Sequence, residues 1–423
     1  MNPDVLVIGG GSAGVAAALA AARQGADTLL VERHGFLGGA GTASLVHSFC
    51  GLYELPPTPD AVPKVANPGL PVELERELRA LGIAHGPVRM GKVDVLLHQP
   101  QRLAWFYDQW CQRQPHLKVL LHTEALDCVV NECHVTEVTL HCRGSSWKLR
   151  PRAVVDASGD AMLAVLTNHP WEATPSKELQ RPAYIVGIGN VTAEVLADDA
   201  PLKIVGSLAR AIQAKKLPTE AAGAHFRTSG GSNELFLTLD LPGDTSEGAF
   251  DANDPHSLTS IEMLGRDLSF SIVDHLKREM AGFSNARITT LPARAGIRES
   301  RRWMGEMILT EEDILESRDS EQAVANATWP LELRETARGP RLLYPRAPKA
   351  CGIPLGCLRA RDLQNVFIAG RCLSATHRAQ ASIRVMGTAL ATGQAAGISA
   401  ASKEKRSDAL AQKVRKVLSG LET

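Results

Sequence analysis

Hydrophobic residues near the start of the chain come in short runs that alternate with glycine-rich or small residues. Residues 5–8 read Val-Leu-Val-Ile and residues 28–31 read Thr-Leu-Leu-Val, each the length of a buried strand. Between these runs lie a glycine-rich stretch at residues 9–14 and an alanine-rich stretch at residues 15–23, which favours a helix. The pattern therefore predicts a strand, a glycine turn, a helix and a second strand that ends at Glu32.

Later segments repeat both kinds of pattern. From residue 118 the period of apolar residues becomes two, which predicts a small β meander over residues 119–150. Further strands are predicted at residues 153–155, 184–188, 234–240, 287–291 and 365–369. Apolar residues at helical spacing predict helices over residues 72–81, 95–114, 258–280 and about 382–401.

The glycines of the first turn have the spacing of a dinucleotide-binding site. Gly9 allows a tight turn, Gly11 lets backbone amides approach a pyrophosphate, and Gly14 lets the helix pack closely on the strand. The amides at the helix N-terminus then hold the phosphates. Glu32 is placed to accept hydrogen bonds from ribose hydroxyls, so the pattern predicts an adenine dinucleotide, either FAD or NAD.

Three further segments follow, and the first of them favours FAD over NAD. A second glycine-rich turn follows at residues 33–42, and a simple NAD site does not need one. The other two segments are Asp156-Ala-Ser-Gly-Asp at residues 156–160 and the apolar run at residues 365–369 that leads into Gly370. Together these motifs resemble those of the glutathione-reductase-type FAD-binding fold.

Longer blocks resemble the broad bacterial family of FAD-dependent oxidoreductases that is distantly related to fumarate reductase flavoproteins. They are residues 296–305, 309–314, 370–377 and 382–386. The resemblance implies FAD and the fold, and it implies that the N-terminal end of the last long helix points at the flavin pyrimidine. The residues expected to contact FAD are Gly9, Gly11, Ser12, Ala13, Gly14, Glu32, Arg33, Gly38, Gly39, Ala40, Thr42, Ala157, Ser158, Gly159, Asp160, Gly370, Arg371, Ser382 and Ile383.

The predicted fold class is α/β, with a Rossmann-type FAD-binding domain that carries the β meander. A chain of 423 residues is long enough for a second domain. We expect that domain to be α+β, with a mixed or antiparallel sheet over the flavin. We assign residues 1–170 and 351–423 to the discontinuous FAD-binding domain and residues 171–350 to the substrate domain.

Candidate catalytic residues follow from the needs of flavin chemistry. If an alcohol or amine is oxidised, a group must accept a proton, and His377 between the last strand and the last helix is the first candidate. The alternative is a histidine that only bonds the flavin edge or the loop backbone. His47 is a second choice.

Several arginines could bind a substrate carboxylate or neutralise reduced flavin. Arg298 and Arg302 are the leading candidates, with Arg301 and Arg384 as others, and structural ion pairs with nearby glutamates are the alternative. Fumarate reductase relatives use an arginine as proton donor, but none aligns here.

Composition narrows the possible functions. Lys plus Arg and Asp plus Glu both number 46, so nothing marks the chain as a binder of nucleic acid or of an anionic membrane. No signal peptide or membrane-spanning segment is recognisable, so a cytoplasmic protein is expected. Eight cysteines without disulfide or zinc spacing fit free thiols, and no metal site is predicted.

The sequence predicts an FAD-dependent oxidoreductase, a dehydrogenase or oxidase that transfers hydride between a small organic substrate and flavin N5. Alternatives are a reductase of an activated C=C bond, a flavoprotein with structural FAD, and an RNA-modifying flavoprotein. Only one dinucleotide fingerprint is present, so electrons should leave to oxygen, a quinone, a carrier protein or a diffusing pyridine nucleotide. A homodimer is the expected oligomer if one forms.

Overall fold

A five-stranded parallel sheet is the central layer of the computed structural model, which describes residues 2–197, 200–228, 233–242, 244–245, 248–336 and 339–421. Every residue of the middle strand β1 (Val5–Ile8) and of its neighbour β10 (Ala153–Asp156) is buried. The sheet confirms the predicted Rossmann-type arrangement. Its strands lie in the order β23 (Val366–Ile368), β10 (Ala153–Asp156), β1 (Val5–Ile8), β2 (Thr28–Val31) and β6 (Leu117–Leu120).

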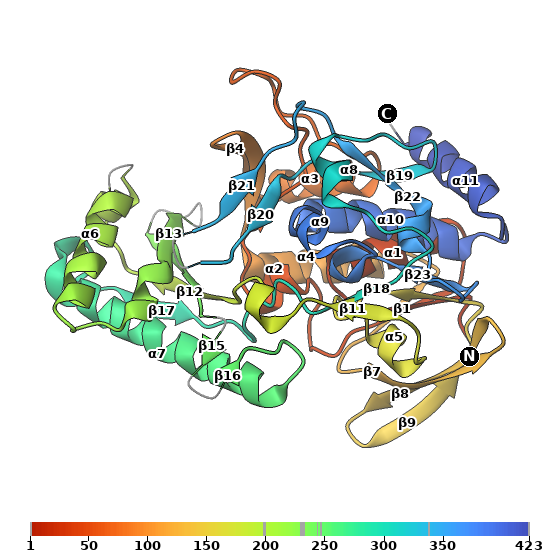
Figure 1. Cartoon of the computed structure of the whole chain (residues 1–423), viewed down its shortest axis with the longest axis horizontal. Coiled ribbons are helices and arrows are strands. Elements are labelled where there is room, and N and C mark those ends of the chain that lie inside the picture. The colour runs from red at the N-terminus through yellow and green to blue at the C-terminus, as the bar shows by residue number, and fades with distance from the viewer. Residues whose placement is uncertain are drawn as a thin grey trace.

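Two buried helices from opposite ends of the chain pack on one another in the core of this unit. They are α1 (Ser12–Arg23) and α10 (Met386–Ala401), which lie together in Figure 1. A Cβ on Gly393 or Gly397 would lie 2.1 Å from the carbonyl oxygen of Ala13 or Ala17, respectively. The two helices can therefore approach this closely only because both positions are glycine.

The predicted meander consists of three strands: β7 (Glu124–Asn131), β8 (His134–Cys142) and β9 (Ser145–Leu149). The preceding segment, which was expected to belong to it, instead forms β6 at the edge of the parallel sheet, beside β2. A strand of four residues carries too little alternation to show which sheet it joins.

The helix predicted over residues 95–114 is wrong in its first part. Residues Val93–His98 form β5, which pairs with β4 (Ala84–Met90) and β3 (Ser48–Phe49). The helix α4 (Pro100–Gln112) begins at Pro100, where the fixed φ of proline suits the first helical position.

The helix predicted over residues 382–401 is also wrong at its start. The chain forms α9 (His377–Ile383) and then α10, with Arg384 and Val385 between them. Val385 is extended, with φ −74° and ψ 154°, and this conformation interrupts the helix. A new helix N-terminus therefore arises at Met386.

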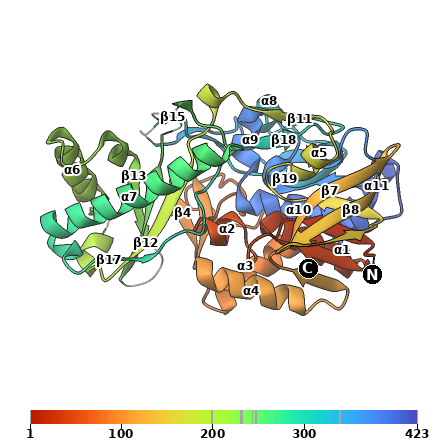
Figure 2. The ribbon, with the colours of Figure 1, turned by 90° about the horizontal axis from the view of Figure 1, so that it is seen from below.

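A second unit carries the antiparallel sheet expected in the middle of the chain. Its core is separate from that of the parallel sheet and includes Tyr184, Leu237 and Ile272. Figures 1 and 2 show this unit on the left, with the long helix α7 running along it. The domain boundaries at residues 170 and 350 stay a prediction. The elements of the unit are β13 (Ala224–Thr228), β14 (Glu234–Asp240), β12 (Ala183–Gly189), β17 (Arg287–Thr290), α6 (Ala200–Gln213) and α7 (Pro255–Glu279).

Short strands and helices make up the rest of the described fold. Among the described residues, no helix combines the length and the apolar composition needed to cross a bilayer. The short strands pair as β11 (Trp171–Ala173) with β18 (Arg301–Trp303), β19 (Ala323–Ala327) with β22 (Cys351–Pro354), β20 (Leu331–Leu333) with β21 (Arg341–Leu343), and β15 (Asp244–Thr245) with β16 (Gly248–Ala249). The remaining α-helices are α2 (Ala40–Ala43), α3 (Leu70–Ala80), α5 (Met162–Leu166), α8 (Glu311–Leu315) and α11 (Ser407–Ser419).

Candidate active site

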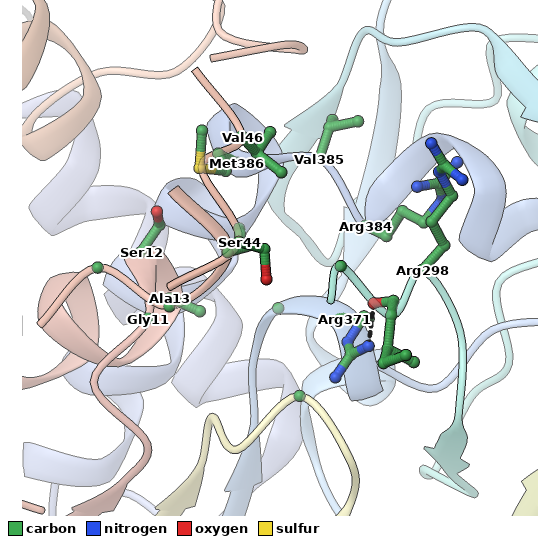
Figure 3. A pocket seen from close by; sticks show the side chains of 18 of the residues that line it. Gly11, Ser12, Ala13, Ser44, Val46, Arg298, Arg371, Arg384, Val385 and Met386 are labelled. Atoms are coloured by element: carbon green, nitrogen blue, oxygen red, sulfur yellow. Dashed lines mark hydrogen bonds between the residues drawn. The ribbon is translucent and has the colours of Figure 1, made fainter. Parts of the chain in front are cut away.

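A cavity of about 390 Å³ lies where the turn after β1 meets the second unit. Figure 3 shows Gly11, Ser12 and Ala13 on one side of it and Arg298 and Arg384 on the other. The cavity is thus lined both by the predicted dinucleotide turn and by residues from the middle of the chain.

The first turn has the geometry that its glycines predict. Gly9 has φ +99°, and a Cβ there would lie 2.6 Å from the carbonyl oxygen of Ala157. A Cβ on Gly14 would lie 1.7 Å from the carbonyl oxygen of Gly9, so helix and strand could not keep their contact. A Cβ on Gly11 would lie 3.7 Å from Gly39 Cα, which is an ordinary contact distance. Gly11 itself lines the cavity.

Glu32 lines the cavity directly after β2 and is 6% exposed. One carboxylate oxygen accepts from the backbone N–H of Gly10 at 2.7 Å, and the other accepts from that of His34 at 2.8 Å. These two bonds fix the carboxylate in place. Each oxygen keeps a lone pair with which it can accept from a ribose hydroxyl.

Asp156 shapes the third turn from the end of β10. It is fully buried and accepts hydrogen bonds from Ser158, from the backbone of Leu163 and, at 2.8 Å, from Nε1 of Trp303. Burial raises the pKa of Asp156. These bonds hold Ala157, Ser158 and Gly159 against the cavity.

Asp160 lies at the end of the same turn and forms an ion pair with Arg371. Nη2 of Arg371 lies 2.5 Å from the carboxylate of Asp160, and Nη1 donates to the carbonyl oxygen of Ile297. Burial alone would raise the pKa of Asp160, but Arg371 and the hydrogen bond from Ser300 outweigh it and lower the pKa. The ion pair holds Arg371 at the cavity wall, where Figure 3 shows it.

The N-terminal end of α10 reaches the cavity, which Arg384, Val385 and Met386 line. The positive end of a helix dipole favours a negative charge within about one turn. The family resemblance predicts that the flavin pyrimidine lies at this helix end.

Two carboxylates hold arginines at the second unit's end of the cavity. Asp240, at the end of β14, accepts from Arg298 at 2.7 Å and from Arg334 at 2.6 Å. Arg334 also donates to Glu332 at 2.7 Å. Burial acts to raise the pKa of Asp240, but the two guanidinium charges outweigh it and lower the pKa to about 2. The carboxylate of Asp240 is therefore ionised throughout the neutral pH range.

His47 lines the cavity and is 4% exposed. Its ring stacks on Phe236 with centroids 4.2 Å apart, and its Nδ1 lies 3.2 Å from the carbonyl oxygen of Leu45. Burial, followed by the charge of Arg227, lowers the pKa of His47 to about 3, so the ring is neutral at pH 7. If Nδ1 carries the proton that bonds Leu45, Nε2 carries a lone pair, and within the described chain Nε2 has no partner.

Of the three predicted catalytic residues, two are not among the described residues that line the cavity: His377 and Arg302. Nδ1 of His377 lies 2.8 Å from Glu299, whose side chain is fully buried, and Arg302 donates to the same carboxylate oxygen at 2.6 Å. Thr174 completes this buried network through bonds to all three. Arg298, the neighbour of Glu299, does line the cavity.

The structure brings most of the predicted FAD contacts to one wall. Five of them do not line the cavity and instead support residues that do or pack beside them: Gly14, Thr42, Asp160, Ser382 and Ile383. The predicted contacts that line it are Gly9, Gly11, Ser12, Ala13, Glu32, Arg33, Gly38, Gly39, Ala40, Ala157, Ser158, Gly159, Gly370 and Arg371.

Sequence reasoning missed the lining residues contributed by the second unit and by the segments that follow it. Arg227, Arg294, Trp329, Glu332 and Arg334 all line the cavity. None lies in a glycine-rich motif, and they come together only through the pairing of distant strands. No local pattern indicates them: even Arg227 lies in a strand of mixed character, Ala-His-Phe-Arg-Thr.

The chain is similar to a known protein family in sequence and to solved structures in fold. A sequence model of a family described as FAD dependent oxidoreductase matches residues 4–421. No curated protein matches the chain. Among solved structures, a geranylgeranyl bacteriochlorophyll reductase-like protein from Thermoplasma acidophilum is 12% identical, with 99% of this chain and 83% of that chain covered and a TM-score of 0.49. The p-nitrophenol 4-monooxygenase PnpA from Pseudomonas putida DLL-E4 is 10% identical, with 98% and 80% covered and a TM-score of 0.45.

Proposed function

This chain belongs to the FAD-dependent oxidoreductase family, and we propose that it is a dehydrogenase or oxidase that takes hydride from a small organic substrate bound in the cavity. The observation that supports the proposal is the composition of the cavity wall. FAD-type glycine turns and polar side chains of the second unit line the same space, as expected for a pocket between two units.

The residues present fit FAD. In this proposal the backbone around Gly11 and Ser12 binds the pyrophosphate, Glu32 binds a ribose, and the N-terminal end of α10 lies at the flavin ring. Arg371, held by Asp160, adds a positive charge to the same wall. When bound, FAD supplies a hydride acceptor at N5.

We propose that His47 contacts and positions an alcohol or amine substrate and does not accept its proton, because its Nε2 is buried and its pKa of about 3 makes the ring too weak a base to accept the proton at neutral pH. It lines the cavity, it is neutral at pH 7, and its ring is fixed by Phe236 and Leu45. His377 stays the competing prediction. Its Nδ1 is committed to Glu299, and in our proposal it supports the segment that carries Arg298.

The experiment is anaerobic visible spectroscopy of the purified FAD-loaded protein while alcohols, amines, carboxylic acids and sugars are added in turn. Bleaching of the flavin bands by one class supports the proposed direction of electron flow, and oxygen uptake in air separates an oxidase from a dehydrogenase. We expect His47→Gln to slow the bleaching by about 10²-fold through misplacement of the substrate, and His377→Gln by less than about tenfold.

Two results would contradict the proposal. A protein without flavin bands after reconstitution with FAD would remove its premise. A substrate class that oxidises the pre-reduced protein, with none that bleaches the oxidised one, would favour a C=C reductase instead.

A further inference from the structure

The second unit's end of the cavity is rich in guanidinium groups. Two carboxylates, those of Asp240 and Glu332, pair with them in the described chain. Four positive charges therefore face two negative ones, which leaves a surplus of two. The arginines that line this end are Arg227 on β13, Arg298 after β17, Arg334 after β20 and Arg384 between α9 and α10.

Two of the four arginines are fixed parts of the wall. Arg334 donates from Nε to Glu332 and from Nη1 to Asp240, and its side chain is 8% exposed. Arg298 donates from Nη2 to Asp240 and from Nη1 to the carbonyl oxygen of Arg181. Both guanidinium groups thus have a carboxylate partner already.

Arg384 has no carboxylate partner among the residues that the structure describes. Its Nη2 donates to Oε1 of Gln180 at 3.0 Å and to the carbonyl oxygen of Glu332 at 3.1 Å, which are both neutral acceptors. Its Nε is buried without an acceptor, and so is Nε2 of Gln180, a side chain that is 2% exposed. Burial lowers the pKa of Arg384 to about 10, so the group stays charged at pH 7.

Arg227 is the second cation without an ion pair in the described part of the chain. Its one hydrogen-bond contact with a described residue is long, 3.9 Å from Nη1 to the sulfur of Met90. Burial, together with the charges of Arg334 and Arg227, lowers the pKa of nearby His225 to about 4, although Asp240 acts in the opposite direction. His225 is therefore neutral at pH 7 and adds no charge to the site.

We propose that this end of the cavity binds a carboxylate group of the substrate and that Arg384 and Arg227 hold it. The inference rests on the proposed function, because it names the substrate class of the same site. A carboxylate is planar and accepts two parallel N–H bonds from one guanidinium group. It would supply the acceptors that Arg384 lacks, whereas a neutral substrate would leave both cations uncompensated away from water.

The neighbouring wall indicates what the rest of the substrate is like. Ile185, Trp329 and Val385 line the cavity beside these arginines, and Trp329 is 7% exposed. An apolar wall next to a cationic end fits an organic acid with a small apolar body. The C–H bond to be oxidised then belongs to that body.

The test measures equilibrium binding and does not depend on turnover. The FAD-loaded protein is titrated at constant ionic strength with acetate, benzoate and succinate, and in parallel with acetamide, benzamide and succinamide. The shift of the visible flavin absorption gives each Kd. We expect each acid to bind at least about tenfold more tightly than its amide.

Two variants assign the binding to residues. Arg384→Gln should raise the Kd of the acids at least about tenfold and leave that of the amides unchanged. Arg227→Gln should act in the same way and replaces the first variant if Arg384→Gln does not fold or retain FAD. The control is Arg346→Gln, because Arg346 has a side chain that is 79% exposed and pairs with Glu316 at the surface.

Three results of the binding experiments would overturn the inference. They are amides that bind as tightly as the acids, an Arg346→Gln effect equal to that of Arg384→Gln, and inorganic phosphate that binds as tightly as acetate. Flavin reduction by an uncharged alcohol, with no acid bound, would overturn this inference and leave the proposed function standing. If acids bind through Arg384 while no substrate class bleaches the flavin, the inference stands and the proposed function is overturned.

Discussion

His47 links stability to pH in a way that one substitution can isolate. Its pKa is about 3 in the folded protein, against 6.5 for an ordinary histidine. Because the folded-state value is the lower one, the contribution to stability is fully present above pH 6.5 and is lost as the pH falls toward 3. Between pH 7 and pH 5 the unfolded chain takes up this proton and the folded protein does not.

The size of the effect follows from the pKa difference. Each pH unit in this window costs about 1.4 kcal/mol, so the free energy of unfolding should fall by about 2 kcal/mol between pH 7 and pH 5 on account of His47 alone. His47→Gln should remove that part of the pH dependence. The assay is urea unfolding at both pH values, followed by tryptophan fluorescence.

His98 offers a matched control, since it is fully buried with a pKa of about 4 but does not line the described cavity. His98→Gln should reduce the pH dependence by a similar amount and leave flavin bleaching unchanged. If His47→Gln keeps the full wild-type difference between pH 7 and pH 5, the neutral, desolvated state assigned to His47 is refuted.

Three further substitutions test the wall of the cavity. Gly14→Ala should weaken FAD binding by at least about 100-fold, because its Cβ would lie 1.7 Å from the carbonyl oxygen of Gly9, and a purified variant with full flavin bands would contradict this. Trp303→Phe removes the indole donor to buried Asp156 and should lower the free energy of unfolding by about 2 kcal/mol in urea, whereas no change would show that the bond is not needed. Asp240→Asn leaves two buried guanidinium groups without their shared carboxylate and should cost about 3–5 kcal/mol by the same assay, and a loss below about 1 kcal/mol would refute the pairing.

The features that the sequence predicted correctly are local ones. The turn after β1 and the acid after β2 lie within one strand–helix–strand unit, so spacing alone positions Gly9, Gly14 and Glu32. The family resemblance likewise rests on contiguous motifs, and the match to the FAD-dependent oxidoreductase family confirms it.

The missed features depend on tertiary pairing. Asp240, Arg298 and Arg334 lie on segments far apart in the chain, and β14, the loop after β17 and the segment after β20 must be placed before their charges meet. The same holds for the choice between His47 and His377. Both lie next to flavin motifs, and only the packing shows which one faces the cavity and which one bonds Glu299.

The packing of α1 on α10 has a consequence for how the protein is made. The first strand and helix are synthesised before the helix that packs on them, which places Gly393 and Gly397 against Ala13 and Ala17. A nascent chain that stops before residue 386 has the first glycine turn and lacks the helix end that reaches the same cavity. The cavity is therefore complete only after α10 has been synthesised, and until then the apolar face of α1 that α10 covers lacks that partner.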